Sequence, residues 1–389
     1  MLADVTAVLG TLSVVLWAGL LLLRGWFWRA DQRLDEAVAD GRRDWPRVVA
    51  VIAARNEAPT IALAVDSLLK QDYPGDFRVV LVDDNSDDGT AEKGRAAAGD
   101  SGRLGVVAGS PLEPGWTGKL WALDQGLEEA ERVSPEATYI LLTDADIAHD
   151  PENLRRLVAK AENHRLDLVS LMVLLHCESP WEHLLHPAFV FFFQKLYPFP
   201  WVNDPDRPDA AAAGGCMLVR RTALERAGGV GSIRGRLIDD CALAERIKRS
   251  GPIWLGLAEK VHSLRAHDRL QGIWKMVART AFAQLNQSTL ALIGTVIGMA
   301  LLYLTPPAVT LAGAAIGETA AALSGLAAWL LMAVAYRPTS RLYGQPGWLV
   351  LLLPLAALLF TLMTVDSARR HWRKRGGSWK GRSYKFPFG

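Results

Sequence analysis

Residues 139–151 read Tyr139-Ile-Leu-Leu-Thr-Asp-Ala-Asp-Ile-Ala-His-Asp-Pro151. The stretch opens with a continuous apolar run, Tyr139 to Leu142, which predicts a buried strand. Two carboxylates, Asp144 and Asp146, follow where such a strand ends. Their side chains converge only if the chain turns between them. At the carboxyl edge of an α/β sheet this arrangement suits a divalent cation, since Mg2+ prefers oxygen ligands. A surface turn with solvated carboxylates is the simpler alternative.

Further apolar runs on both sides of this stretch predict more strands of the same sheet. A helical pattern over residues 61–69 separates the first two runs, and strand–helix–strand units of this kind are right-handed by default. We therefore expect an α/β domain over residues 47–270. The predicted strands are Arg47–Ala54, Phe77–Val82, Gly105–Ala108, Leu166–Leu175 and Cys216–Val219.

Polar side chains gather at the ends of these runs. Arg55-Asn56-Glu57 follows the first, and four Asp residues lie within six positions at Asp83–Asp88 after the second. A helix needs a single cap, so some of this charge is available for a ligand. A ribose hydroxyl or a base N–H would suit a carboxylate acceptor.

Two later segments carry further candidate groups. Lys119 lies near the start of a predicted helix in Pro114–Leu123, where a phosphate contact and an ordinary exposed lysine are both open. Asp239 and Asp240 begin another short helix that ends at Gly251. One of the pair satisfies a capping role, which leaves a second carboxylate available as a general base.

The ends of the chain are apolar. Val5–Leu23 carries no charge and is long enough to span a bilayer, and no cleavage signal accompanies it. The expected organisation is an anchor over 1–24, a linker over 25–46, an interfacial amphipathic helix over 271–288, transmembrane helices over 289–366 and a basic tail over 367–389. The three C-terminal candidates are Thr289–Leu304, Thr319–Tyr336 and Gly347–Val365.

Composition says little about binding partners other than the membrane. The formal net charge is +2, and the three cysteines have no C-x-x-C spacing, so neither a zinc site nor a disulfide framework is indicated. The basic tail adjoins an apolar span, which favours anionic headgroups over nucleic acid. The aromatic block Trp181–Trp201 is interrupted by prolines, so we expect no single regular element there.

The motifs together resemble those of the inverting family 2 glycosyltransferases with the GT-A fold. The segment Gly115–Ala122 and the flanking spans are similar to the hopene-associated branch, membrane enzymes linked to bacterial hopanoid lipids. The matching motifs run in the family's order: Ala53–Glu57, Val82–Thr90, Gly118–Lys119, Thr143–Asp146, Gly214–Gly215 and Asp239–Leu243.

The resemblance implies roles for particular residues. Glu57, Asp83 and Asp84, with Arg55 beside them in the same motif, would bind the UDP-sugar donor. Asp146, assisted by Asp144, would hold Mg2+ or Mn2+ on the diphosphate, and Lys119 would lie nearby. Asp240 would be the catalytic base, with Asp239 as the other member of the acidic pair. Gln271 and Trp274 stand where the family has a Gln-x-x-Arg-Trp motif, which is not intact here.

The resemblance implies transfer of a sugar to a lipid hydroxyl by a multi-pass protein of the bacterial inner membrane, with the α/β domain in the cytoplasm. A processive polysaccharide synthase and a catalytically dead membrane scaffold are the alternatives. The altered Gln-x-x-Arg-Trp motif speaks against the synthase, and the complete set of acids speaks against the scaffold. Three C-terminal crossings would place the basic tail outside, against the positive-inside rule; we expect a cytoplasmic tail.

Overall fold

The computed structural model describes residues 2–34, 44–373, 378–380 and 382–383. The chain divides into two compact units. The α/β unit comprises Asp31–His176, Trp201–Arg265 and Ser378–Gly389, and the helical unit comprises Met1–Ala30, Cys177–Pro200 and Ala266–Gly377. Part of the expected linker (residues 35–43) and part of the expected basic tail (374–377, 381 and 384–389), including Lys374, Arg375 and Lys385, lie outside the described residues.

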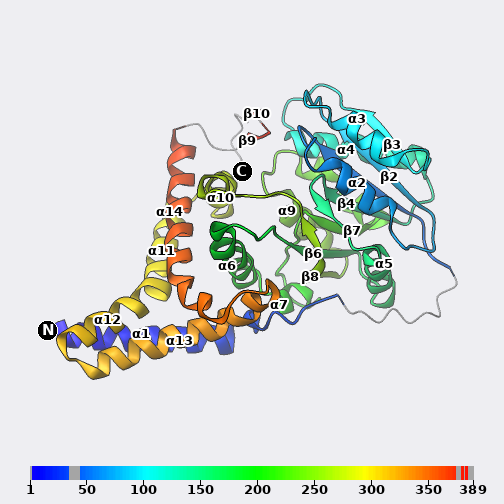
Figure 1. Ribbon diagram of the computed structural model, residues 1–389. Coiled ribbons are helices and arrows are strands. Elements are labelled where there is room, and N and C mark those ends of the chain that lie inside the picture. The colour runs from blue at the N-terminus through cyan, green and yellow to red at the C-terminus, as the bar shows by residue number, and fades with distance from the viewer. Residues whose placement is uncertain (1, 35–43, 374–377, 381, 384–389) are drawn as a thin grey trace. The chain divides into compact units, whose positions relative to one another are not determined.

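The α/β unit is built on an eight-stranded sheet with the order β3-β2-β1-β4-β7-β6-β8-β5 (Figure 1). The GT-A-like α/β fold expected from the sequence is confirmed, and each predicted apolar run forms a strand. The strands are β1 Val48–Ala54, β2 Phe77–Asp83, β3 Leu104–Ala108, β4 Tyr139–Asp144, β5 Ile147–Ala148, β6 Leu168–Leu174, β7 Cys216–Arg220 and β8 Ile253–Ser263.

The register of the first strands brings their carboxyl ends to one edge. β1 pairs in parallel with β2 and with β4, so that Ala54 lies opposite Asp83 and Ala53 lies opposite Asp144. β7 runs antiparallel to both β4 and β6, which makes the sheet mixed. The strand interiors are almost fully buried because helices cover the sheet.

One of the covering helices approaches the sheet unusually closely. A Cβ added to Gly126 of α4 would collide with the side chains of Val51 and Val82, so only glycine allows this contact. The helices of the α/β unit are α2 Ile61–Leu69, α3 Thr90–Ala98, α4 Gly118–Val133, α5 Asn153–Asn163, α8 Arg221–Arg226 and α9 Asp239–Lys248; α7 Phe199–Asn203 stands at its boundary.

Four segments of the helical unit are long and apolar enough to cross a membrane: Ala3–Leu23, Thr289–Ile316, Thr319–Leu342 and Gly347–Trp372. The second bends through a π-helical turn, η3 Ala300–Leu304, before Pro306 and Pro307. The helices are α1 Leu2–Leu23, α6 Pro180–Leu196, α10 Leu270–Gln284, α11 Thr289–Met299, α12 Thr305–Ile316, α13 Thr319–Leu342 and α14 Leu353–Trp372, with short turns η1 Phe27–Arg29 and η4 Gly347–Leu352.

Within this unit α1, α12 and α13 pack together as a three-helix bundle (Figure 1). The Trp17 indole donates to the Leu302 carbonyl, and Gly10 lies against Val309 and Ser324. Trp17 of α1 therefore lies near Leu302, just before α12, and the earlier residue Gly10 lies near Val309, further along. The two helices α1 and α12 thus run antiparallel.

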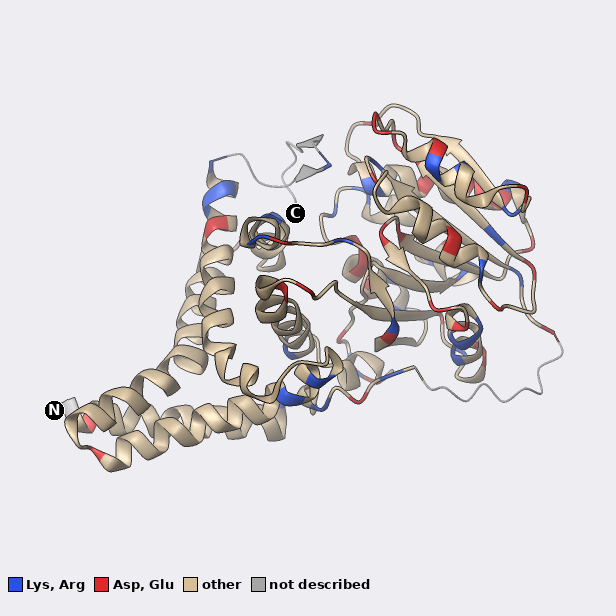
Figure 2. Cartoon of the chain, in the orientation of Figure 1, with Lys and Arg blue, Asp and Glu red and all other residues tan. Residues whose placement is uncertain are grey.

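The two ends of this bundle differ in charge (Figure 2). Asp4 in the first turn of α1 and Glu318 at the start of α13 lie at one end. Arg24 follows the other end of α1, and Arg337 and Arg341 lie in the last turns of α13. The bundle therefore has an acidic end and a basic end.

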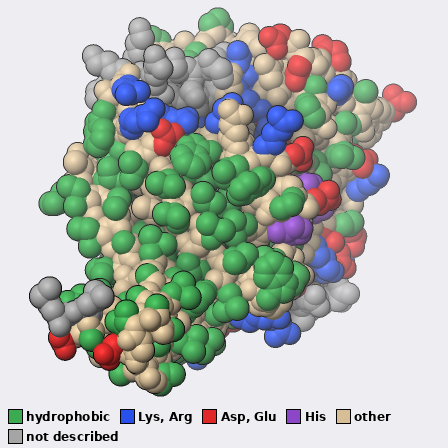
Figure 3. All heavy atoms as spheres, turned by 60° about the vertical axis from the view of Figure 1, so that its left-hand side comes forward, with side chains coloured by type: hydrophobic (Ala, Val, Ile, Leu, Met, Phe, Trp, Pro, Cys, Tyr) green, Lys and Arg blue, Asp and Glu red, His purple; other side chains and the backbone are tan. Residues whose placement is uncertain are grey.

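The remaining long helix, α14, packs against α10 and α11. Its outward face carries Leu355, Leu358, Leu362 and Val365 at helical spacing, all exposed. Figure 3 shows a broad hydrophobic surface, bordered by lysine and arginine side chains. Apolar patches of this extent are typical of membrane contact.

The aromatic block Trp181–Trp201 is divided between two helices, as expected from its prolines: α6 ends at Leu196 and α7 begins at Phe199. Pro187 does not interrupt α6, which continues through it. Ser179 and Glu182 form a capping box that starts the helix, and the buried side chains of Leu185 and Phe191 pack in the core of the unit. This packing offsets the backbone hydrogen bond that Pro187 cannot donate.

Glu182 also ties α6 to the segment before α10. Its fully buried carboxylate accepts backbone N–H groups from Glu178, Ser179 and His267. His186 and His267 lie close enough for the three side chains to surround a metal ion. Because the carboxylate already accepts three backbone bonds, we interpret this cluster as a structural clamp.

Candidate active site

The candidate site lies at the carboxyl edge of the sheet, where the ends of β1, β2 and β4 align. Asp144 ends β4, and Asp146 follows in the turn toward β5. The side chain of Asp144 is about a third exposed and that of Asp146 is mostly buried. The turn expected between the two carboxylates is therefore present.

Lys119 links two parts of the site. It lies in the first turn of α4, and its Nζ is 2.9 Å from Asp144 Oδ1 and 3.1 Å from Asp239 Oδ2. Burial lowers the pKa of Lys119, but the neighbouring carboxylates Asp144 and Asp239 outweigh it and leave the pKa raised. Lys119 is consequently a fixed cation, and the simple exposed lysine considered from the sequence does not describe it.

Asp240 is held differently from Asp239. Its two oxygens accept backbone N–H groups, Oδ2 from Gly214 at 2.9 Å and Oδ1 from Cys241 at 2.8 Å. Burial, followed by the charge of Asp239, raises the pKa of Asp240 to about 6. A Cβ on Gly214 would crowd both Lys119 and Asp240, so the glycine gives these side chains their room. Of the acidic pair, Asp239 forms an ion pair with Lys119, whereas the carboxylate of Asp240 is held by backbone N–H groups.

A second cation, Arg265, bridges Asp146 and Glu57. Its Nε is 2.6 Å from Asp146 Oδ2, and its Nη2 is 2.6 Å from both oxygens of Glu57. Burial lowers the pKa of Arg265, but the two carboxylates outweigh it and leave the pKa raised. The sequence analysis missed Arg265. Arg265 lies just beyond β8, and the end of β8 pairs with β5, next to Asp146. This position is the only indication of its role.

The loop after β2 is organised by Arg55. The guanidinium donates to the Asn85 carbonyl at 3.1 Å and lies 3.9 Å from Asp84 Oδ2. Asp84 is only 1% exposed, whereas Asp83 is half-buried at the strand end and accepts from Ser86. Asp83 is therefore accessible to a ligand, whereas Asp84 is buried and pairs with Arg55.

A buried histidine supports the turn that carries Asp144 and Asp146. His149 Nε2 lies 2.9 Å from Thr143 Oγ1, and Nδ1 lies 3.0 Å from Asn153 Nδ2. Thr143 in turn donates to the Gly215 carbonyl at 2.7 Å. Burial lowers the pKa of His149 to about 3, so the ring is neutral. This network joins the end of β4 to the loop that carries Gly214.

A small pocket opens beside these groups. Its lining combines the charged side chains of Lys119, Asp144, Asp239 and Asp240 with apolar side chains. Such a combination of convergent polar groups and apolar surface is typical of small-molecule sites. The apolar lining consists of Leu120, Leu123, Leu142, Met217, Val230, Ile233 and Leu243.

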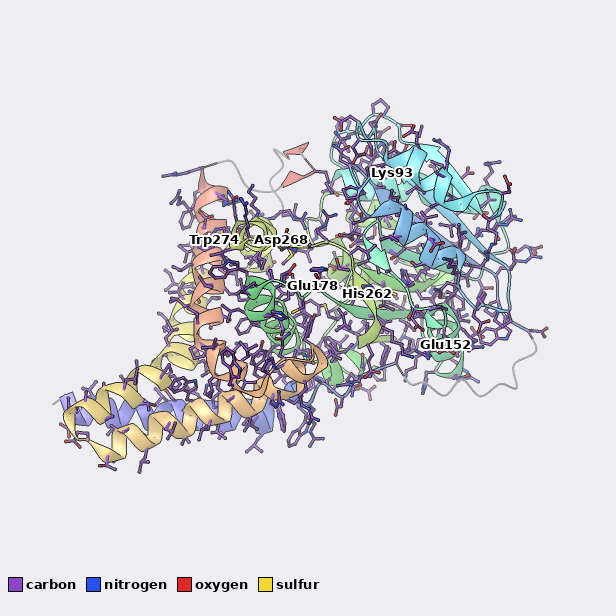
Figure 4. All side chains as sticks on the ribbon, in the orientation of Figure 1. Lys93, Glu152, Glu178, His262, Asp268 and Trp274 are labelled. Carbon is purple, nitrogen blue, oxygen red and sulfur yellow. The ribbon has the colours of Figure 1, made fainter. Side chains whose placement is uncertain are left out.

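Two predicted site residues, Gln271 and Trp274, belong to the helical unit (Figure 4). Gln271 is exposed in the first turn of α10. The Trp274 indole donates to Asp366 of α14 at 2.9 Å, and its ring packs at the edge of the unit's core. Trp274 therefore has a structural role within the helical unit.

Comparisons with known proteins agree with this geometry. Residues 49–228 match the family model described as glycosyl transferase family 2. A mannosyltransferase from Pyrobaculum calidifontis, solved in complex with GDP-Man and Mn2+, is similar in structure, with 22% identity, a TM-score of 0.54 and coverage of 92% of this chain and 99% of that one. At this identity the likeness shows a shared fold.

Other solved glycosyltransferases match less closely. Mannosyl-3-phosphoglycerate synthase from Rubrobacter xylanophilus shares 18% identity over 62% of this chain and 74% of its own, with a TM-score of 0.40. Among curated proteins none matches the sequence. Residues 49–228 are therefore similar to a glycosyl transferase family 2 domain, and the chain shares the fold of a solved glycosyltransferase.

Proposed function

We propose that the protein transfers a sugar from a UDP-sugar to a hydroxyl of a hopanoid-type membrane lipid, with inversion at the sugar carbon. The observation that carries the proposal is the division of labour within the acidic pair. Asp239 is paired with Lys119, whereas Asp240 is paired with no cation among the described residues, and its pKa is raised to about 6. A carboxylate in that state is suited to general-base catalysis near neutral pH.

The mechanism needs few groups. Asp240 accepts the proton of the acceptor hydroxyl while the hydroxyl oxygen attacks the sugar carbon, and the bond from that carbon to the diphosphate breaks. General-base catalysis contributes on the order of 10²–10⁴-fold. Lys119, 3.1 Å from Asp239 and 2.9 Å from Asp144, keeps the neighbouring acids in place. Asp83, Glu57 and Arg55 would hold the nucleoside.

Asp144 and Asp146 would hold Mg2+ or Mn2+. The donor set fits: two carboxylates share one turn, and each already lies within 2.9 Å of a cationic side chain, so the turn attracts positive charge. When bound, the ion would neutralise charge on the departing diphosphate. The complex of the Pyrobaculum enzyme with GDP-Man and Mn2+ supports a nucleotide-sugar donor and a metal here.

The lipid acceptor is proposed from the apolar helices. Four segments could cross a membrane, and their exposed faces are rich in leucine. A glycosyltransferase anchored in this way lies beside lipid hydroxyls at the membrane surface. The same helices would also suit a processive polysaccharide synthase, the alternative considered from the sequence.

The membrane topology follows from the charged ends of the bundle and from the tail. We infer that α1, α12 and α13 cross the bilayer with the basic end in the cytoplasm, in line with the positive-inside rule. Lys380 of the tail contacts Glu57 in the α/β unit, so tail and α/β unit share one side. Between the α/β unit and the tail, the chain would cross the bilayer twice, in α12 and in α13. We therefore infer that α14 lies at the cytoplasmic face.

The activity is tested by UDP release from membranes that carry the protein. We expect release from one of UDP-glucose, UDP-galactose or UDP-N-acetylglucosamine, dependent on a hopanoid or polyprenyl lipid extract and abolished by EDTA. Asp240→Asn should lower the rate by about 10²–10⁴-fold, because the base is lost, and should still bind UDP.

Asp100→Asn is the matched control, since Asp100 is an exposed carboxylate in a loop outside the site. Full activity of Asp240→Asn, or loss of its UDP binding, would refute the assigned base. Release from GDP-mannose in place of every UDP-sugar would refute the uridine assignment alone.

The pH dependence of kcat/KM should reflect the protonation state of Asp240. A general base must be deprotonated, so kcat/KM should fall about tenfold per pH unit below the pKa of about 6. Asp239→Asn should move this acidic limb to lower pH, because removing the neighbouring negative charge favours the Asp240 carboxylate. An acidic limb that stays in place in Asp239→Asn would contradict the assignment.

Reporter fusions test the topology. A fluorescent protein fused after Gly389 should be bright and alkaline phosphatase at the same position inactive, since both tail and α/β unit are placed in the cytoplasm. Fusions after Glu318, at the acidic end, should behave in the opposite way and serve as the control. Active phosphatase after Gly389 would mean that α14 crosses the bilayer.

A further inference from the structure

The C-terminal tail reaches the candidate donor site. β9 Ser378–Trp379 and β10 Arg382–Ser383 pair as a short antiparallel ladder, and Lys380 lies in the turn between them. Although this turn is more than 300 positions away in sequence, it belongs to the same compact unit as the first strand of the sheet. The sequence analysis assigned this tail only to lipid headgroups.

Lys380 is held by three contacts with the loop after β1. Its Nζ lies 2.7 Å from Glu57 Oε1 and 3.1 Å from the Asn56 carbonyl. Arg55 Nε donates to the Lys380 carbonyl at 3.2 Å. The motif expected to bind the donor therefore contacts both the ammonium group and the backbone carbonyl of Lys380.

The backbone of Lys380 is in a restricted conformation. Its φ is 48°, in the left-handed region that non-glycine residues seldom adopt. Such conformations persist where surrounding contacts hold them, and they are frequent in ligand-binding clamps. Arg55 supplies such a contact here. The tail is therefore docked in a defined geometry at this loop.

Glu57 has two cationic partners. Its carboxylate, with the side chain only 10% exposed, is shared by Lys380 and by Arg265. Arg265 has a second partner in Asp146, whereas Lys380 has only Glu57 and the Asn56 carbonyl among the described contacts. An ammonium in this position is suited to a further anion, and a donor diphosphate would bring two phosphates to this edge of the sheet.

We propose that Lys380 is a donor-binding residue supplied by the C-terminal tail, and that its ammonium moves from Glu57 to the diphosphate when the nucleotide-sugar binds. This inference rests on the proposed function, since it assigns a further ligand for the same donor. The tail then has a catalytic-site role in addition to any contact with headgroups. Lys380 acts as a phosphate ligand, so it contributes to donor affinity and leaves the proton transfer to Asp240.

The test measures binding of UDP and of UMP, each with Mn2+, to the full-length detergent-purified protein. Lys380→Gln should weaken UDP about ten- to hundredfold, the usual effect of losing a charged hydrogen bond. UMP should weaken less, because it lacks the second phosphate, so the UDP-to-UMP affinity ratio should fall. A purely structural effect of the tail would weaken both nucleotides equally.

The matched control is Arg373→Gln, which removes one positive charge from an exposed position of the tail directly after α14. It should leave the affinity ratio unchanged. A chain ending at Arg373 should reproduce the Lys380→Gln result. Unchanged UDP binding in Lys380→Gln would overturn the proposal, and tighter binding would show that the lysine competes with the donor.

Failure of the proposed function gives a different result. If the wild-type protein binds neither UDP nor GDP with Mn2+, the nucleotide-sugar activity itself is refuted. If wild type binds UDP and Lys380→Gln binds it with the same UDP-to-UMP ratio, only the role of the tail is refuted.

Discussion

The site depends on one electrostatic constraint: several carboxylates meet at a single sheet edge, and cationic side chains must offset their mutual repulsion. Lys119 joins Asp144 to Asp239, and Arg265 joins Asp146 to Glu57. Each of these acids is at least partly withdrawn from water, where uncompensated charge is costly. The two bridging cations therefore make the acidic edge compatible with a folded protein.

The same constraint explains how a metal and a donor would enter. A divalent ion at Asp144 and Asp146 would replace cationic side chains that now face these acids. The released cations would lie beside the donor, where the diphosphate is their natural partner. In this scheme the ion pairs exchange partners when a metal and a donor bind, while the neutral His149 and the hydrogen bonds of Thr143 keep the turn in place.

Local sequence patterns were sufficient to predict the strands and the acids at their ends. Buried parallel strands are continuous apolar runs, and their carboxyl ends share one edge of the sheet. Local patterns were not sufficient for Arg265 and Lys380, whose partner Glu57 lies far away in the chain. Side-chain pairings across such separations depend on the assembled fold. The continuation of α6 through Pro187 was not predicted for a related reason, since tertiary packing overrides the effect of the proline.

The most direct test of this account is the affinity of the purified protein for Mn2+, measured by electron paramagnetic resonance without nucleotide. If Arg265 neutralises Asp146 and competes with the metal, Arg265→Gln should bind Mn2+ more tightly, on the order of fivefold for a partly exposed ion pair. Arg33→Gln, which breaks an exposed pair with Glu259, should leave the affinity unchanged. Equal or weaker Mn2+ binding by Arg265→Gln would contradict the exchange of partners on which the account rests.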